Sequence, residues 1–228
     1  MSERDYASEP IKGLPGLPPR GERILWQGRP DWRGLARGAY FGDWVAIYFA
    51  ALVAWRVGDG LAAGAPAWEL AIHAAWLALV GVVALALIAG AAWLSARATV
   101  YTITNRRVVL RIGAALRVTL NVPFAQVTAA ALRPTSGGRG DIALTIGGKD
   151  RFALLLLWPH ARPWRFARPE PMLRALPDAQ AAATVLAEAL RTWQAEHGVA
   201  PGPAARPAAA SRPTPTPRPA PGRVVAAE

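Results

Sequence analysis

Two long apolar stretches interrupt an otherwise mixed chain, and they dominate its hydrophobic pattern. Residues 70–96 carry no formally charged side chain. As an α-helix this run is long enough to cross the roughly 30 Å hydrocarbon core of a bilayer with some tilt. The apolar run 45–57 is shorter and includes Arg56, so a span here requires a helix that starts near Ala39 and lets Arg56 reach the headgroups. The pattern predicts a transmembrane hairpin with helices at 39–57 and 68–96.

The placement of arginine predicts the orientation of this hairpin. Arginines precede the first span and follow the second, whereas the connecting loop, residues 58–67, contains neither Lys nor Arg. Because Lys and Arg concentrate on the cytoplasmic side of membrane proteins, both termini are expected in the cytoplasm. The protein is therefore predicted to be a multi-pass protein of the cytoplasmic (inner) membrane.

After residue 97 the continuous apolar pattern gives way to short alternating stretches that are rich in β-branched residues. About six strands follow one another without intervening helices, which is typical of an antiparallel β-sandwich or open barrel. A further short strand is expected within residues 22–28. The expected strands of the β-domain are 99–104, 107–112, 116–122, 124–132, 141–146 and 151–157.

The end of the chain divides into an irregular stretch, a helix and a tail. Residues 159–177 are rich in proline and are expected to be extended and irregular. Asp178 has the position of a helix N-cap, apolar residues then recur at helical spacing, and Gly198 is a suitable C-cap. We expect this helix to close the β-domain. The predicted organisation is an N-terminal cytoplasmic segment (1–38), the hairpin (39–96), the β-domain with its helix (97–197) and a disordered Pro/Ala/Arg tail (198–228).

Composition and charge narrow the function classes. Charged residues make up 18% of the 228 residues and the mean hydropathy is +0.18, whereas soluble domains carry about 25% charge. The chain has no cysteine, which excludes disulfides, thiol catalysis and thiolate metal sites. The net charge of +11 is concentrated in residues 97–228 and suggests contact with anionic lipid or acidic protein surfaces. No nucleic-acid-binding motif and no acid/base or metal constellation is evident, so we expect no nucleic acid, no enzyme activity, no catalytic residue, no metal and no cofactor.

One short segment combines aromatic, arginine and proline residues in the manner of a partner-binding surface. Trp and Arg dominate the energetics of many protein interfaces, and proline reduces the ordering entropy that is lost on docking. The alternative is a loop that packs its two Trp rings over the sheet. The candidate partner-binding residues are Trp158, His160, Arg162, Trp164 and Arg165.

A second candidate surface is basic and follows the hairpin directly. Arg106, Arg107 and Arg111 lie in the first strand pair of the expected β-domain, a few residues beyond the second span. Basic groups near an anionic leaflet contribute about 1 kcal/mol each, so these three are candidate lipid headgroup contacts. The alternative is a structural turn with a solvated strand face.

The sequence also resembles known families. Residues 101–108, which read YTITNRRV, resemble the signature of bacterial pleckstrin-homology-like (PH-like) domains, and residues 21–30 resemble the segment that precedes the hairpin in that superfamily. The resemblance implies a membrane-anchored α+β protein: a two-helix transmembrane hairpin followed by a PH-like antiparallel β-sandwich or open barrel. Residues 157–165 and 168–174, with 13–15 and the hairpin, are similar to the PuhB family of photosynthetic complex assembly proteins of purple phototrophic bacteria.

The narrower resemblance covers roughly residues 10–195 and implies a non-catalytic scaffold or chaperone. Its partners would be reaction-centre and light-harvesting subunits, and its location the cytoplasmic or intracytoplasmic photosynthetic membrane. A homodimer is compatible with a lone hairpin and exposed strand edges. The residues leave a second function open, a membrane-anchored PH-like module that binds anionic lipid or a membrane protein unrelated to photosynthesis.

His73 is a candidate pigment ligand in this context. A neutral imidazole on a membrane helix can ligate the magnesium of bacteriochlorophyll, which suits a factor that hands over pigment. The alternative is a histidine near the membrane edge that hydrogen-bonds to Glu69, one helical turn away, or to water.

Overall fold

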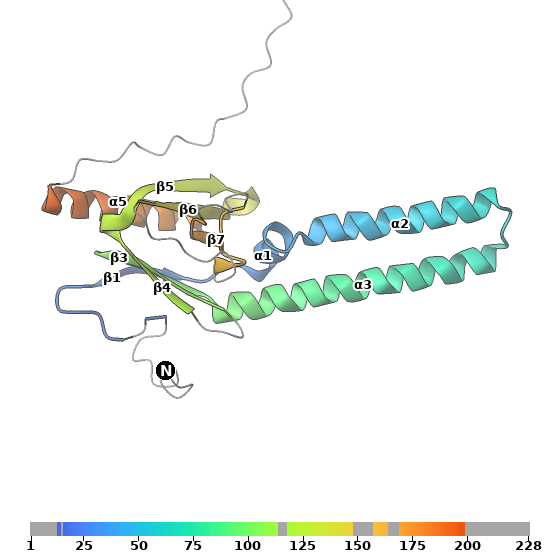
Figure 1. Cartoon of the computed structure of the whole chain (residues 1–228), viewed down its shortest axis with the longest axis horizontal. Helices are drawn as coiled ribbons and strands as arrows, with labels where there is room; N and C mark the ends of the chain where they lie inside the picture. The colour runs from blue at the N-terminus through green and yellow to red at the C-terminus, as the bar shows by residue number, and fades with distance from the viewer. Residues whose placement is uncertain (1–12, 15, 114–117, 148–156, 164–168, 199–228) are drawn as a thin grey trace, which may run out of the picture.

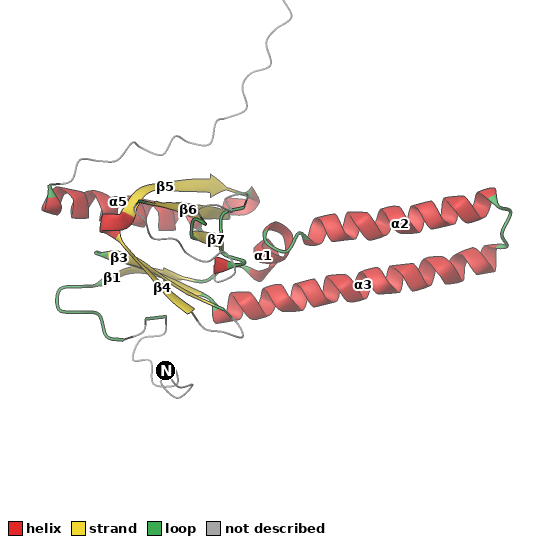
Figure 2. Ribbon diagram, in the orientation of Figure 1, coloured by secondary structure: helices red, strands yellow, loops and turns green. Residues whose placement is uncertain are grey.

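The computed structural model describes residues 13–14, 16–113, 118–147, 157–163 and 169–198. Two long helices, α2 and α3, project side by side from a β-domain that consists of two antiparallel sheets and a covering helix (Figures 1 and 2). The β-domain holds the larger hydrophobic core, whereas the two long helices expose most of their apolar side chains.

The two projecting helices correspond to the two apolar runs. Helix α2 (Gly42–Ala62) begins three residues later and ends five residues later than expected. Helix α3 (Ala67–Ala98) is longer than expected by one residue at its N-terminus and by two at its C-terminus. Both are long and apolar enough to cross a membrane. They pack closely where glycine allows it, since a Cβ atom added to Gly60 would lie 2.1 Å from Leu70 and one added to Gly81 would lie 2.9 Å from Phe49.

The first sheet joins residues from both sides of the hairpin. Its order is β1-β2-β3-β4, and all pairs are antiparallel. Strand β1 precedes the hairpin in sequence and pairs with β2, which follows it. The N-terminal segment, expected as a separate part, therefore contributes an edge strand to the β-domain. The strands are β1 (Ile24–Gly28), β2 (Val100–Thr104), β3 (Arg107–Ile112) and β4 (Val118–Pro123).

The second sheet has the order β5-β6-β7, with β6 in the centre. Strands β5 (Val127–Pro134) and β6 (Gly140–Ile146) lie close to their expected positions, although a short 3₁₀ turn over Phe124–Gln126 delays the start of β5. Strand β7 (Met172–Leu176) corrects the expectation that residues 159–177 are irregular. The expected strand 151–157 lies outside the described residues except for Leu157, which is buried in a helical turn.

Helix α5 (Ala179–His197) covers the β-domain as predicted. The Asp178 carboxylate accepts a hydrogen bond from the backbone N–H of Ala181 at 3.0 Å, and Gly198 ends the helix in a left-handed conformation. Its buried face, with Ala182 and Leu186, packs into the same core as both sheets. The two sheets stay separate and do not close into a barrel.

A short helix, α1 (Trp32–Gly38), connects the β-domain to the hairpin. Leu35 and Ala39 pack against Ala92 and Ala96 of α3 and against Ala175 of β7. Figure 1 shows α1 nearly end-on, whereas α2 and α3 run across the view. Helix α1 therefore lies across the base of the hairpin.

Candidate functional site

His160 occupies the junction between the hairpin and the β-domain. Its side chain is buried, with 1% exposed, and both ring nitrogens have partners. Nδ1 lies 2.7 Å from the hydroxyl of Tyr101 on β2, and Nε2 lies 3.1 Å from the hydroxyl of Thr99, which links α3 to β2. The imidazole of His160 thus connects the loop before β7 to the residues that directly follow α3.

The donor and the acceptor of each hydrogen bond in this network follow from the two backbone groups at its ends, a carbonyl oxygen that only accepts and an N–H that only donates. The Thr99 hydroxyl donates its proton to the carbonyl oxygen of Ser95 at 2.7 Å, so it accepts from Nε2–H of His160. Nδ1 of His160 then carries the lone pair and accepts from the Tyr101 hydroxyl, which itself accepts the backbone N–H of Arg174 at 3.2 Å. The network is complete with a neutral imidazole protonated at Nε2.

The environment of this network favours its neutral form. Burial and, to a smaller extent, the charge of Arg174 together lower the pKa of His160 to about 3. Burial also raises the pKa of Tyr101 well above its ordinary value. Both groups keep fixed protonation states at neutral pH, so this network holds elements in place and does not move protons.

Arg174 extends the junction to α1. Its guanidinium donates to the carbonyl oxygens of Pro159 at 3.1 Å and Gly38 at 2.6 Å. Burial lowers the pKa of this guanidinium, which still carries its charge at neutral pH because an arginine titrates far above it. Its hydrogen bonds tie β7, the loop before it and the end of α1 into one unit.

Tyr40 completes the junction on the other side. Its hydroxyl lies 2.7 Å from the hydroxyl of Ser95 on α3, and its ring meets Trp158 edge-on at 5.1 Å between ring centroids. Residues on both sides of the hairpin thereby contact the loop that contains His160. The hairpin and the β-domain are joined by packing and by a continuous set of hydrogen bonds.

The structure divides the candidate partner-binding residues. His160 is buried, which corrects the expectation that it contributes to a docking surface. Trp158 has 56% of its surface exposed, and Arg162 is half-buried and forms an ion pair with Glu170 at 2.7 Å. Trp164 and Arg165 lie outside the described residues. Trp158 and Arg162 remain as candidates at the surface.

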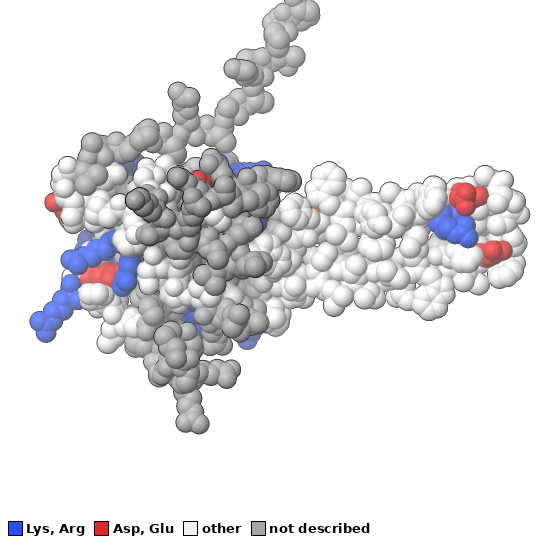
Figure 3. Space-filling model, viewed as in Figure 1, with Lys and Arg blue, Asp and Glu red and all other residues white. Residues whose placement is uncertain are grey.

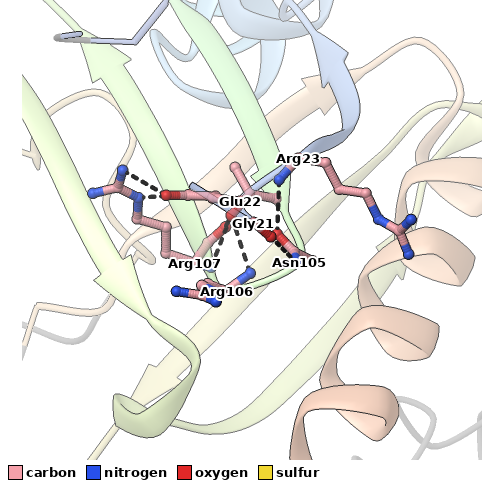
Figure 4. A network of polar contacts seen from close by, with 7 residues as sticks. Gly21, Glu22, Arg23, Asn105, Arg106 and Arg107 are labelled. Atoms are coloured by element: carbon pink, nitrogen blue, oxygen red, sulfur yellow. Dashed lines mark hydrogen bonds and ion pairs between the residues drawn. The ribbon is translucent and has the colours of Figure 1, made fainter. Parts of the chain in front are cut away.

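The signature around residues 101–108 has a structural role at the far end of β2 (Figure 4). The Thr104 hydroxyl accepts the backbone N–H groups of Arg106 and Arg107 and so closes the β2–β3 turn. The Asn105 side chain accepts from the backbone N–H of Arg23 at 2.9 Å and donates to the carbonyl oxygen of Gly21 at 3.0 Å. These contacts fix the segment that leads into β1.

Arg107 holds the segment that leads into β1 through an ion pair with Glu22. Its guanidinium donates two hydrogen bonds, of 2.8 and 2.9 Å, to the carboxylate of Glu22, whose side chain is only 3% exposed (Figure 4). A bidentate pair of this kind is directional and strong. Arg107 is thus engaged within the β-domain and is not presented to lipid.

The basic turn lies at the end of the β-domain opposite the hairpin. Strand β2 leaves the end of α3 and runs away from it for five residues, which places Arg106 about 17 Å from the hairpin at about 3.3 Å per residue. Figure 3 shows Lys and Arg side chains gathered at the end of the β-domain opposite the hairpin. Arg111 lies opposite Val100, at the hairpin end of the sheet, but is buried with 8% exposed. The pairing of Arg107 and the burial of Arg111 do not favour headgroup contacts by these two residues, and for exposed Arg106 such a contact stays a prediction.

His73 lies near the loop end of the hairpin. Its Nδ1 is 3.1 Å from the guanidinium of Arg56, which also pairs with Asp59 at 3.9 Å. Arginine only donates hydrogen bonds, so Nδ1 accepts and the neutral imidazole carries its proton on Nε2. In this arrangement neither ring nitrogen offers a free lone pair to a metal. No group of three or more His, Cys, Asp or Glu side chains suited to a metal ion occurs among the described residues.

The residues that organise both ends of the β-domain were mostly not singled out from the sequence. Tyr101, Glu22 and Arg174 carry the key hydrogen bonds, and the signal that the sequence offered for them was their place in the segments that resemble known families. Arg174 stands in a proline-rich stretch whose composition indicated an irregular chain.

Comparison with known proteins identifies the class to which this fold belongs. The bacterial PH domain family matches residues 45–190, from within α2 to within α5, and the chain belongs to this family. It is 38% identical over 206 residues to a Rhodobacter capsulatus protein described as an uncharacterized 23.7 kDa protein in the puhA 5' region. The match covers 90% of this chain and 96% of that protein. No solved structure matches the chain.

Proposed function

We propose that this protein is a non-catalytic, membrane-anchored assembly factor for the photosynthetic reaction centre and its light-harvesting complex in a purple phototrophic bacterium. The observation that carries the proposal is the R. capsulatus relative, which matches nearly end to end and is encoded in the puhA region, a photosynthesis gene context. The relative and this chain therefore share the hairpin and the β-domain together, and the proposed role belongs to the whole protein.

The surface of the hairpin supports membrane anchoring. At about 1.5 Å per residue, the 21 residues of α2 span about 31 Å and the 32 residues of α3 about 48 Å. Figure 3 shows a hairpin surface whose visible charged groups gather near the loop. Exposed tryptophans lie at both ends, where amphipathic rings favour the membrane interface. These are Trp44 and Trp93 near the β-domain, and Trp55 and Trp68 near the loop.

The distribution of arginine supports an orientation with both termini in the cytoplasm. Arg33, Arg37 and Arg97 are exposed at the end of the hairpin that meets the β-domain. The loop between α2 and α3, residues 63–66, contains no Lys or Arg. By the positive-inside rule the β-domain then faces the cytoplasm, at the cytoplasmic or intracytoplasmic membrane.

The junction around His160 supports a scaffolding mechanism. A factor that guides assembly must hold the membrane part and the cytoplasmic part of a nascent subunit in one relative position. The hydrogen bonds of Tyr101, His160 and Arg174 connect the hairpin to the β-domain and supply such a fixed geometry. Reaction-centre and light-harvesting subunits are the proposed partners, with exposed Trp158 beside the junction as their first contact.

The test is a gene deletion in a phototrophic host, followed by complementation with the full-length protein. We expect the deletion to lower reaction-centre content, measured from membrane absorption spectra, while bacteriochlorophyll is still made. The wild-type gene restores the content. Trp158→Ala restores it only in part, whereas Trp76→Ala, which removes a comparably exposed ring from the hairpin, restores it fully.

Two outcomes decide against the proposal. A deletion strain with normal reaction-centre content refutes an assembly role in photosynthesis. If the tagged protein is nevertheless recovered from membranes with an unrelated protein, the chain is instead a PH-like module that serves another membrane partner.

A further inference from the structure

Two arginine–tryptophan pairs lie at the base of the hairpin, one on α1 and one on α3. The guanidinium of Arg33 lies over the ring of Trp32 on α1, 5.3 Å from its centroid. The guanidinium of Arg97 lies over the ring of Trp93 on the last turns of α3, at 5.5 Å. We call these four residues the basal collar.

The packing of α1 and α3 turns the basal collar outward. Leu35 and Ala39 of α1 are buried against α3. At about 100° per residue, Arg33 lies about 140° around the helix from the centre of that buried face. On α3, Ala92 and Ala96 face α1, while Arg97 follows one position later and is exposed. The arginines therefore point sideways from the base of the hairpin.

The basal collar also lies at a defined level along the molecule. Arg97 is one residue before the end of α3, and β2, the strand that follows α3, begins at Val100. Helix α1 lies across the hairpin at the same junction (Figure 1). If the apolar hairpin spans the bilayer, this level coincides with the headgroups of the leaflet next to the β-domain.

The charge balance at this level is positive. Asp31 is hydrogen-bonded to the guanidinium of Arg139 at 3.0 Å and caps α1, and exposed Asp43 lies 3.8 Å from Arg37. Both of these carboxylates thus already face other arginines. Arg33 and Arg97 instead contact tryptophan rings, which hold a guanidinium in place without neutralising its charge.

We propose that the basal collar binds the phosphates of anionic phospholipids in the leaflet adjacent to the β-domain. The guanidinium group donates hydrogen bonds in a planar fork that matches phosphate oxygens, and the tryptophan rings favour the same interfacial depth. The site replaces the turn at Arg106 and Arg107 as the lipid-facing basic surface. The inference rests on the proposed membrane anchoring and adds the lipid class that the anchor selects.

The experiment compares two charge-matched variants of the full-length protein in nanodiscs. Arg33→Gln/Arg97→Gln removes the charges of the basal collar, and Arg23→Gln/Arg106→Gln removes two exposed arginines at the opposite end of the β-domain. Spin-labelled phosphatidylglycerol and phosphatidylcholine are the probes, and electron paramagnetic resonance gives their relative association with the protein. Thermal unfolding verifies that both variants stay folded.

The wild type and the Arg23/Arg106 variant are expected to prefer phosphatidylglycerol. In the basal collar variant this preference falls about fivefold or more, the factor expected from one arginine near an anionic surface. An unchanged preference in the basal collar variant, or an equal loss in the Arg23/Arg106 variant, overturns the proposal. A wild type that inserts into nanodiscs without preferring phosphatidylglycerol also overturns it but leaves the membrane anchor intact, whereas failure to insert refutes the anchor itself.

Discussion

The hydroxyl oxygen of Tyr101 lies 2.7 Å from Nδ1 of His160, although 59 positions separate the two residues in the chain. Tyr101 stands on the first strand after the hairpin, and His160 stands in the loop that leads to the last strand. Both are buried, so each satisfies a polar group that water cannot reach. This contact helps to fix the orientation of the hairpin relative to the β-domain.

Removing the Tyr101 hydroxyl is expected to destabilise the protein. Tyr101→Phe leaves Nδ1 of His160 and the backbone N–H of Arg174 without their partner, which costs about 1–3 kcal/mol of the free energy of unfolding. Denaturant unfolding in detergent micelles measures the loss. Tyr48→Phe, at an exposed position of α2, is the control and should change little; equal effects of the two substitutions would argue against the junction network.

The neutral state of His160 predicts a pH dependence of stability. Its pKa is about 3 in the folded protein and about 6.5 when unfolded, so between these values only the unfolded chain binds the proton. The full contribution to stability is therefore present above pH 6.5 and is lost as the pH falls toward 3, by about 1.4 kcal/mol per pH unit.

The measurement compares unfolding free energies of the wild type and His160→Gln between pH 7 and pH 4.5. Glutamine does not titrate and can donate and accept at similar positions. The wild type should lose stability more steeply than the variant as the pH decreases. Parallel curves would show that His160 is protonated equally in the folded and unfolded states.

The ion pair between Glu22 and Arg107 is expected to matter more than an exposed pair. Glu22→Gln removes the carboxylate from a nearly buried position and leaves the guanidinium with one poorer acceptor. We expect a loss of about 2–3 kcal/mol, somewhat less than the roughly 3–5 kcal/mol found when a fully buried pair is broken, because Arg107 is partly exposed. Asp43→Asn breaks the exposed contact with Arg37 and should cost less than about 1 kcal/mol. Thermal unfolding of both variants tests the difference, and a reversed order would contradict the role assigned to Glu22.

Two glycines of α3 should respond differently to the same substitution. A Cβ atom at Gly81 would lie 2.9 Å from the ring of Phe49, whereas no atom lies within 4 Å of a Cβ at Gly90. Gly81→Ala is therefore expected to push α2 and α3 apart and to cost about 1–3 kcal/mol. Gly90→Ala should be neutral or slightly stabilising because alanine favours a helix. Thermal stability in detergent distinguishes the two, and equal tolerance at both positions would refute the observed helix contact.

Features that depend on nearby residues were predictable from the sequence. The uncharged run 70–96 indicates α3 because no proline interrupts it, and Asp178 and Gly198 delimit α5 through local capping. Alternating β-branched residues likewise predict β2 and β3.

Features that depend on distant partners were not predictable in this way. Strand β7 is short and flanked by prolines, and it is recognisable only through its pairing with β6. The burial of His160 depends on Thr99 and Tyr101, about sixty residues earlier. Arg106 follows α3 closely in sequence, yet the direction of β2 carries it away from the hairpin.

The central claim is that α2 and α3 cross the membrane with the β-domain in the cytoplasm. The chain contains no cysteine, so single cysteines can be placed without further changes. Three exposed positions suffice: Ala63 beside the hairpin loop, Val82 on α3 and Gln180 on α5.

A membrane-impermeant maleimide applied to intact cells, and then to permeabilised cells, measures the topology directly. We predict that Ala63→Cys is labelled in intact cells, Gln180→Cys only after permeabilisation, and Val82→Cys in neither case. Labelling of Gln180→Cys in intact cells, or rapid labelling of Val82→Cys, would contradict the account.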